Sequence, residues 1–292
     1  EWDSTTMVVV ELEAGGAHGL GYTYSHAVAA QVVTDVLAPV VEGTDPMAPL
    51  EAWGRMRRAV RNLGGQGIAA MAISVVDIAL WDLRAKLLGV SLTDSLGRRR
   101  EAIAAYGSGG FTSLEGEDLA AQLGGWADEG FEAVKMKVGR GDLRSEEARI
   151  AAARKAIGPG VLLMLDANNA WSDVPTALRY MEVFAPYDPY WIEEPFSPDQ
   201  IDNHAKLAAS TPVPVATGEI EVGRWRFKEM LDKQAASILQ TDAAVCGGIT
   251  EFRRIAALAD CYGVNVCPHW FHDLHVHLVA ASPNGQYVEY FP

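Results

Sequence analysis

The pattern of apolar and polar positions changes character about a third of the way along the chain. An alternating run over residues 5–13 predicts a strand, and the glycines after it predict a turn into a second strand near residues 22–24. Helices are expected from Ser25, over residues 49–62 and over residues 66–88, where apolar positions recur at helical spacing before Gly89. We expect the first hundred residues to form a small α+β unit.

From residue 101 onward, short apolar runs alternate with amphipathic stretches. Strands separated by helices favour a parallel sheet, because a parallel connection needs a long crossover. Eight runs in about 190 residues fit a compact (β/α) barrel. The alternative, a doubly wound open sheet, is disfavoured because no glycine-rich phosphate loop follows the first run. The runs cover residues 103–106, 133–138, 161–165, 190–192, 213–216, 237–239, 264–267 and 287–288.

Composition narrows the class of protein. Of the 292 residues, 49% are hydrophobic and 21% are charged, which is the balance of an ordinary globular chain and suits two domains, residues 1–100 and 101–292. A net charge of −14 gives no broad surface for nucleic acid or an anionic membrane. Three cysteines indicate neither a disulfide framework nor a zinc site, so we expect a reducing cytoplasm. No apolar stretch is long and uncharged enough to span a bilayer.

Polar side chains recur where the predicted barrel strands end. The carboxyl ends of barrel strands meet at one mouth, and catalysis takes place there. Singly, each such residue is more often structural: an Asp after a strand caps a helix, and a lone His is usually a satisfied structural residue. Seven strands in succession with polar ends favour one shared site. The residues are Lys135, Lys137, Asp166, Asn168, Glu193, Glu219, Asp242, His269 and Glu289.

Three of these residues have the chemistry of metal ligands. Asp166, Glu193 and Glu219 come from three neighbouring predicted strands, and carboxylates that point together repel one another unless a cation lies between them. A set of oxygen ligands suits Mg²⁺, with Mn²⁺ as a possible substitute.

The remaining polar residues suggest acid–base chemistry. Lys137 and Lys135 share one face of a strand, and a lysine beside a cation loses its proton more easily. His269 is placed to be oriented by Asp242. Two bases around a metal-bound carboxylate suggest removal of the proton α to that carboxylate, and a protonated Glu289 would hydrogen-bond to the charge that develops.

The Lys-x-Lys pair, the three acidic residues, the Asp–His pair and the terminal Glu occur in an order and spacing that resemble the mandelate racemase subgroup of the enolase superfamily. The resemblance covers essentially the whole chain and implies a partial N-terminal α+β capping domain followed by a modified (β/α)₇β barrel. It implies Lys137 as one base and His269 with Asp242 as the second. It implies that Lys135, Asn168 and Glu289 bind substrate and that Asp166, Glu193 and Glu219 bind Mg²⁺.

The resemblance also limits the reaction. It implies a small carboxylic acid substrate, and dehydration of an acid sugar to a 2-keto-3-deoxy acid is favoured because such dehydratases dominate the subgroup. Racemisation or epimerisation of a 2-hydroxy acid stays open because the same residues serve both reactions. Lactone chemistry is disfavoured by the His–Asp pair. An inactive relative that binds metal or a sugar acid is the non-enzymatic alternative, and relatives of this kind imply a homo-oligomer.

Overall fold

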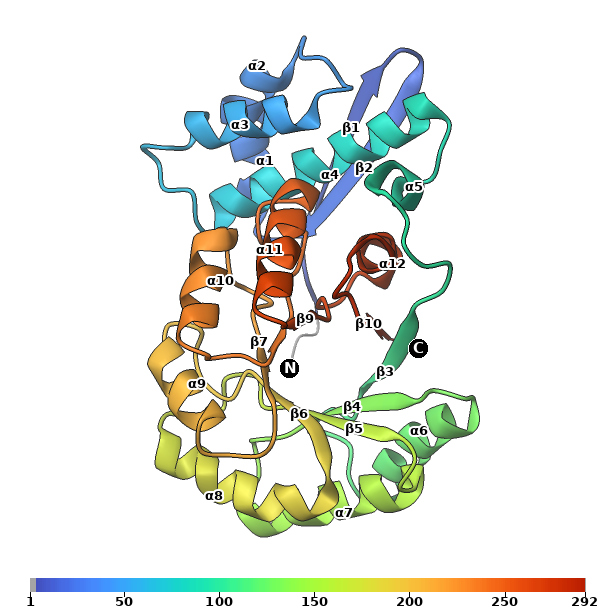
Figure 1. The fold of residues 1–292 in the computed structure, drawn as a ribbon, viewed down its shortest axis with the longest axis vertical. Coiled ribbons are helices and arrows are strands. Elements are labelled where there is room, and N and C mark those ends of the chain that lie inside the picture. The colour runs from blue at the N-terminus through green and yellow to red at the C-terminus, as the bar shows by residue number, and fades with distance from the viewer. Residues whose placement is uncertain (1–3, 292) are drawn as a thin grey trace.

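The structure, a computed structural model, describes residues 4–291 and has two parts (Figure 1). The N-terminal part, which we call the cap, holds an antiparallel pair of strands, β1 and β2, and a set of helices around the long central helix α4. The bounds are β1 (Met7–Ala14), β2 (Ala17–Tyr24), α1 (Val28–Val32), the π-helical segment η1 (Val33–Leu37), α2 (Ala38–Val41), α3 (Pro49–Ala59), α4 (Ile68–Leu88) and α5 (Leu92–Leu96).

The C-terminal part is a parallel barrel. Eight strands follow the order β10-β3-β4-β5-β6-β7-β8-β9, and a parallel bridge between Val266 and Gly285 joins its two ends. The elements are β3 (Ala104–Gly109), α6 (Gly116–Asp128), β4 (Ala133–Lys137), α7 (Leu143–Ile157), β5 (Leu162–Asp166), α8 (Val174–Phe184), η2 (Ala185–Tyr187), β6 (Pro189–Glu193), α9 (Ile201–Ala208), β7 (Val215–Thr217), α10 (Gly223–Asp232), β8 (Ile238–Leu239), α11 (Ile249–Cys261), β9 (Asn265–Val266), α12 (His272–Ala281) and β10 (Tyr287–Tyr290).

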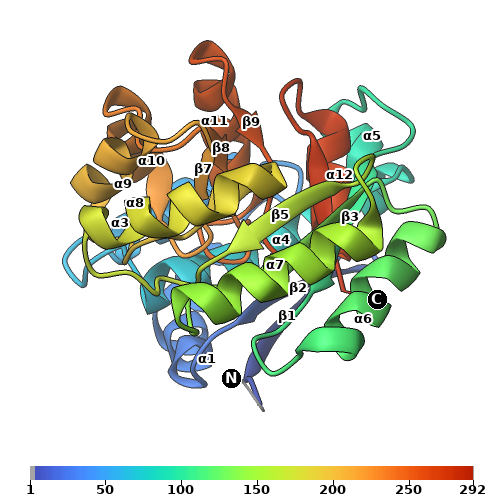
Figure 2. The same cartoon turned by 90° about the horizontal axis from the view of Figure 1, so that it is seen from below.

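This arrangement confirms the predicted modified barrel, and the open doubly wound alternative is wrong. Helices line the outside of the strands in the view of Figure 2. Residue 100, the boundary predicted between the domains, lies in the segment between α5 and β3, and the outermost residues 1–3 and 292 lie outside the described part of the chain. No helix within residues 4–291 is long and apolar enough to cross a membrane.

The cap strands lie unusually close to helix α4. A Cβ atom on Gly21 would lie 2.0 Å from the carbonyl oxygen of Val75, and one on Gly19 would lie 2.2 Å from that of Ala79. Only residues without a Cβ permit this approach. The two glycines therefore allow β2, which ends at Tyr24, to pack directly against α4.

A buried polar contact ties the cap to the barrel. The carboxylate of Asp77, on α4, accepts hydrogen bonds from the backbone N–H and the hydroxyl of Thr250 at the start of α11, at 2.8 and 2.7 Å. The indole of Trp81 donates to the same hydroxyl at 2.9 Å. Because buried polar groups need partners, this contact specifies how α4 docks on the barrel.

Candidate active site

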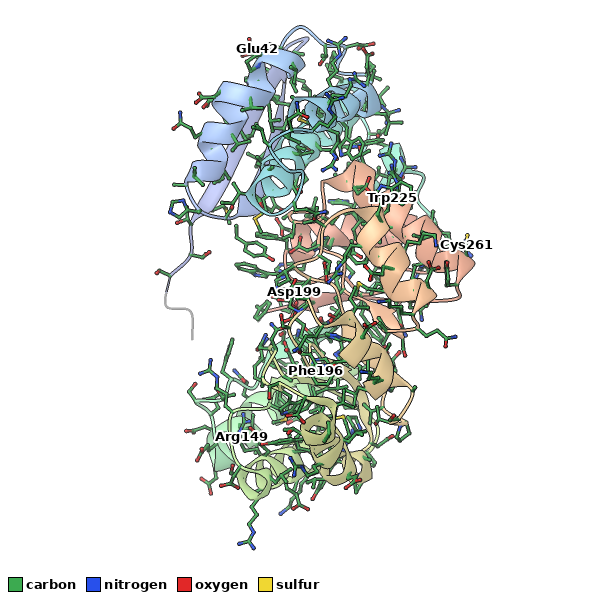
Figure 3. The ribbon with its side chains drawn as sticks, turned by 90° about the vertical axis from the view of Figure 1, so that its left-hand side faces the viewer. Glu42, Arg149, Phe196, Asp199, Trp225 and Cys261 are labelled. Atoms are coloured by element: carbon green, nitrogen blue, oxygen red, sulfur yellow. The ribbon has the colours of Figure 1, made fainter. Side chains whose placement is uncertain are left out.

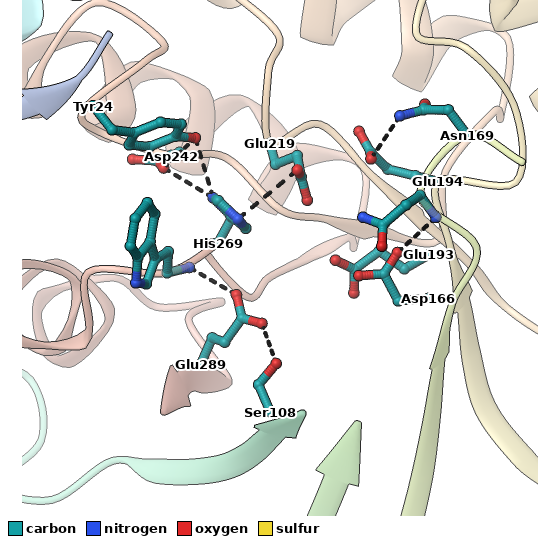
Figure 4. Close-up of polar contacts among 12 residues, drawn as sticks. Tyr24, Ser108, Asp166, Asn169, Glu193, Glu194, Glu219, Asp242, His269 and Glu289 are labelled. Atoms are coloured by element: carbon teal, nitrogen blue, oxygen red, sulfur yellow. Dashed lines mark hydrogen bonds and ion pairs between the residues drawn. The ribbon is translucent and has the colours of Figure 1, made fainter. Parts of the chain in front are cut away.

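The acidic residues expected from the sequence lie with His269 at one mouth of the barrel (Figure 4). Lys137, Asp166 and Glu193 are the last residues of β4, β5 and β6, and the strand register sets them side by side. Glu219, Asp242 and His269 follow the ends of β7, β8 and β9, while Glu289 lies within β10.

Lys135 lies at the centre of the acidic residues. Its Nζ atom is 2.8 Å from Oε1 of Glu193, 2.7 Å from Oε1 of Glu289 and 3.4 Å from Oδ2 of Asp166. Lys137 forms an ion pair with the same Asp166 oxygen. The expectation that both lysines share one face of the strand is confirmed, since both reach Asp166.

The two lysines hold their protons in this arrangement. Burial by itself would lower the pKa of Lys135, but Glu193 and Glu289 outweigh burial and raise it well above its ordinary value. Burial opposes the charge of Lys137 in the same way, and Asp166 outweighs it, so the pKa of Lys137 is raised as well. The easier proton loss expected of a lysine beside a cation therefore stays a prediction.

The carboxylates outnumber the positive charges around them. Burial and the neighbouring Asp166 raise the pKa of Glu193 to about 8. Burial and Glu219 raise the pKa of Glu194 well above its ordinary value. Burial also opposes the charge of Asp166, but Lys137 and Lys135 outweigh it and its pKa is lowered. An additional cation at this mouth would relieve the repulsion that raises the first two pKa values.

The donor set fits a magnesium ion by its chemistry. Asp166, Glu193 and Glu219 offer oxygen atoms, which Mg²⁺ prefers. The side chains do not converge on a metal position. Within residues 4–291, no group of three or more His, Cys, Asp or Glu residues is arranged to hold a metal ion. Lys135 and Lys137 instead lie against Asp166 and Glu193. The ligand set therefore stays a prediction from sequence and charge.

His269 is held by groups from both parts of the chain. Its Nδ1 atom is 3.1 Å from Oδ2 of Asp242 and 3.3 Å from the hydroxyl of Tyr24, which also donates to Asp242 at 3.2 Å. Its Nε2 atom lies 3.8 Å from Oε1 of Glu219. Burial would lower the pKa of His269, but Glu219 and Asp242 outweigh it and raise it to about 10. The predicted Asp–His pair is thus present, and Tyr24 makes it a group of three.

Glu289 accepts hydrogen bonds and does not donate one. Ser108 donates to its Oε1 at 2.7 Å and the backbone N–H of Trp270 donates to its Oε2 at 2.8 Å. Burial would raise its pKa, but Lys135 outweighs burial and lowers the pKa of Glu289 to about 2. The adjacent ammonium favours the carboxylate form of Glu289, so a hydrogen bond from a protonated Glu289 to the developing charge stays a prediction.

The backbone around the mouth adopts conformations that side chains disfavour. Five residues that follow barrel strands have positive φ: Asn168 at 42°, Asn169 at 62°, Glu194 at 41°, Trp270 at 51° and Phe271 at 29°. Such strain persists where the surroundings fix it, and it gathers at functional sites. The side chain of Asn168 is exposed, and its backbone N–H donates to Oδ1 of Asp166 at 2.9 Å, so its expected contact with a substrate stays a prediction.

Sequence reasoning missed several residues at this site. Tyr24 carries no local signal, because its role depends on how the cap docks. Ser108 lies on β3, and this is the one barrel strand that contributes none of the nine predicted site residues, so no sequence pattern marks Ser108. His275 lies on α12, with its Nε2 atom 3.5 Å from Oδ1 of Asp242. Asn169, the residue after Asn168, donates from its side-chain amide to the carboxylate of Glu194 at 3.1 Å.

Two family models match the chain. Residues 2–97 match the mandelate racemase / muconate lactonizing enzyme N-terminal domain, and residues 118–292 match the enolase C-terminal domain-like family. A curated relative, D-galactarolactone cycloisomerase from Agrobacterium fabrum, is 37% identical over 276 residues, covering 92% of this chain and 72% of that protein.

Solved structures agree in fold. A mandelate racemase/muconate lactonizing enzyme-like protein from Rubrobacter xylanophilus has a TM-score of 0.94 and 41% identity, covering 99% of this chain and 80% of the other. L-Talarate dehydratase from Polaromonas sp. JS666, solved as a complex with Mg and L-glucarate, has a TM-score of 0.91 and 36% identity. The match covers 98% of this chain and 82% of the other.

Proposed function

Because the chain belongs to the mandelate racemase/muconate lactonizing enzyme family of the enolase superfamily, we propose that it is a Mg²⁺-dependent enzyme that removes the proton α to the carboxylate of an acid sugar. The observation that carries the proposal is that two base candidates, Lys137 and His269, contact members of one crowded group of buried carboxylates. Figure 4 shows these acids together with His269. The similarity to an enzyme solved with Mg and L-glucarate supports the metal and the substrate class.

The roles follow from position. Asp166, Glu193 and Glu219 would hold Mg²⁺, which would supply the positive charge that stabilises the substrate carboxylate as its α-carbon loses a proton. Lys135, the buried ammonium among the acids, would bind a substrate carboxylate oxygen. Asn168 and Glu289 would also contact the substrate. Lys137 and His269 belong to strand ends that are not neighbours in the sheet, so they can approach different faces of the α-carbon.

Dehydration uses the two bases in different protonation states. One of them takes the α-proton, and the other, protonated, gives its proton to the departing β-hydroxyl so that water leaves. The enol that results rearranges to a 2-keto-3-deoxy acid. The pair formed by His269 and Asp242 suits the acid role, because the Asp242 carboxylate lies 3.1 Å from Nδ1 of His269 and favours the protonated imidazole.

Cycloisomerisation is the second candidate. The His–Asp pair disfavours lactone chemistry from the sequence alone, yet a relative with 37% identity is named as a D-galactarolactone cycloisomerase. Racemisation of a 2-hydroxy acid uses the same residues and is distinguished by its product.

One experiment separates these reactions. The protein is incubated with Mg²⁺ in D₂O and a panel of acid-sugar diastereomers, their lactones and mandelate, and proton NMR follows each compound. Loss of the α-proton with a 2-keto-3-deoxy product establishes dehydration. Deuterium at an inverted or mixed α-carbon indicates racemisation, and an opened or rearranged lactone indicates cycloisomerisation.

The same assay tests the base. Lys137→Met should abolish α-proton exchange on the substrate that the wild type turns over, while Lys206→Met, which removes a charge from α9 far from the mouth, should leave it intact. Unchanged exchange in Lys137→Met would overturn the assignment of Lys137. No exchange by the wild type on any compound, together with Mg²⁺ binding, would favour the inactive relative.

A further inference from the structure

A second cavity lies between the cap and the barrel, outside the site described above. Its volume is about 340 Å³, and none of the nine predicted site residues, all within the described chain, lines it. Its walls come from the end of α3, the start of α10 and the turn before α11. Figure 3 shows one lining residue, Trp225, where the barrel helices approach the cap. A volume of this size is in the range of small-molecule pockets, roughly 300–1,000 Å³.

Arginines dominate the charge of this cavity. It is lined by Arg57, Arg58, Arg61 and Arg224 and by one carboxylate, Glu251. We call it the arginine cavity. Its excess of positive side chains contrasts with the chain as a whole, whose net charge is −14.

The single carboxylate of the arginine cavity is already neutralised. Oε2 of Glu251 lies 2.9 Å from Arg224 and 3.2 Å from Arg254, and its Oε1 accepts from the backbone N–H of Arg224 at 2.9 Å. The single negative charge of Glu251 is therefore shared by two guanidinium groups, and it does not neutralise the arginines of α3.

The arginines on the cap side have no carboxylate partner within residues 4–291. Arg57 donates to the carbonyl oxygen of Gly65 at 2.8 Å, and Arg61 donates to the side chain of Asn62 at 3.4 Å. Arg58 is exposed and forms no ion pair with a described residue. Three guanidinium groups thus remain with donors directed at solvent or at neutral oxygens.

The dipole of α3 does not account for this arrangement. Basic residues in the last turn of a helix stabilise its carbonyl end, which would explain Arg57 and Arg58. Arg61 follows the helix, and Arg224 belongs to the first turn of α10, where a positive side chain is unfavourable. The helices α10 and α11 both begin at the cavity, so their positive ends add to the charge of the arginines.

Two tryptophans give the cavity flat walls. The indole of Trp53 donates to the carbonyl oxygen of Gly247 at 2.8 Å, and the guanidinium of Arg254 lies 4.4 Å from the centre of its ring, so Trp53 is fixed. Trp225 is 72% exposed, and its ring lies 5.3 Å from the guanidinium of Arg224. The exposed indole of Trp225 provides apolar contact for the carbon frame of a ligand.

We propose that the arginine cavity binds a small organic anion that carries at least two carboxylate or phosphate groups. The planar guanidinium binds either group through two parallel hydrogen bonds. The three cap-side arginines, which have no carboxylate partner among the described residues, suit a molecule with two acidic groups better than a molecule with one. The proposal concerns a site away from the barrel mouth and stands whether or not the proposed reaction is correct.

Binding can be measured without the active site. Isothermal titration calorimetry on metal-free full-length protein at 0.15 M NaCl would use inorganic phosphate, pyrophosphate and citrate as probes. The test variant is Arg58→Ala/Arg61→Ala, which removes two exposed arginines that have no ion pair. The matched control is Arg144→Ala/Arg179→Ala, which removes the same charge from exposed positions on α7 and α8, far from the cavity.

The wild type and the control should bind pyrophosphate or citrate with a Kd below about 1 mM and more tightly than phosphate. The test variant should bind at least about tenfold more weakly. Preference for pyrophosphate or for citrate identifies the phosphate or the carboxylate source. Absence of binding by the wild type, equal binding by the test variant, or equal weakening in both double variants would overturn the proposal.

Discussion

The hydroxyl of Tyr24, the last residue of a cap strand, lies 3.3 Å from Nδ1 of His269 at the barrel mouth. The same hydroxyl donates to Asp242 at 3.2 Å. The cap therefore does more than cover the barrel, because it contributes a polar contact to the pair of residues expected to move a proton. The position of Tyr24 depends in turn on the packing of β2 against α4.

Removing that hydroxyl should slow the reaction without unfolding the protein. In Tyr24→Phe the ring keeps its packing against Trp270, with centroids 5.0 Å apart, but His269 loses one of the groups that orient it. We expect kcat to fall by roughly three- to tenfold, less than the roughly 10²–10⁴-fold contribution of an acid–base group itself, because Tyr24 only orients that group. Tyr22→Phe is the control, since Tyr22 donates to Asp273 at 2.5 Å and not to the pair. Equal losses in both variants would mean that Tyr24 acts only through the stability of the cap.

Magnesium should stabilise the protein through Glu219. A ligand that binds the native state raises the melting temperature, and here it would also relieve the crowding of buried carboxylates. Glu219→Gln should weaken Mg²⁺ binding by at least about tenfold, as measured by calorimetry. The control Glu182→Gln, at an exposed position on α8, should bind Mg²⁺ like the wild type. Wild-type affinity in Glu219→Gln would remove it from the ligand set.

The contact between Asp77 and Thr250 should make stability depend on pH. Burial raises the pKa of Asp77 to about 7 although Thr250 lowers it. The folded pKa lies above that of the unfolded chain, so the native state binds more protons between about pH 4 and pH 7 and stability falls as the pH rises through this window. The loss from this group is at most about 4 kcal/mol.

Urea unfolding at several pH values checks this dependence. Asp77→Asn keeps the shape of the side chain but cannot ionise, so its free energy of unfolding should fall less between pH 4 and pH 7 than that of the wild type. Parallel curves for the two proteins would show that Asp77 does not titrate in this window.

The close approach of β2 to α4 should make Gly21 intolerant of a side chain. Its φ angle is outside the left-handed region, so any cost of Gly21→Ala comes from the contact 2.0 Å from the carbonyl of Val75. We expect a loss of roughly 1–3 kcal/mol in the free energy of unfolding. Gly125→Ala is the control, because nothing lies within 4 Å of its added Cβ and alanine favours its helix, α6, by about 0.5–1 kcal/mol. A neutral Gly21→Ala would show that β2 can move away from α4.

The sequence predicted the barrel well because each βα unit repeats one pattern, and the register then aligned Lys137, Asp166 and Glu193 as expected. It could not predict the charge states. The ionisation of Glu289 depends on Lys135, and the contact between them is set by the closure of the barrel between β10 and β3. Tyr24 was missed for a similar reason, because more than two hundred residues separate it from His269 and only tertiary packing brings them together.

The buried ammonium of Lys135 joins acids from strands that are far apart in the chain. Lysine is part of the chain, so the counter-ion for Glu193 and Glu289 is present as soon as β4, β6 and β10 meet. The barrel therefore closes with a positive charge of its own between two of its buried acids, and Glu193 and Glu289 are paired by the fold itself.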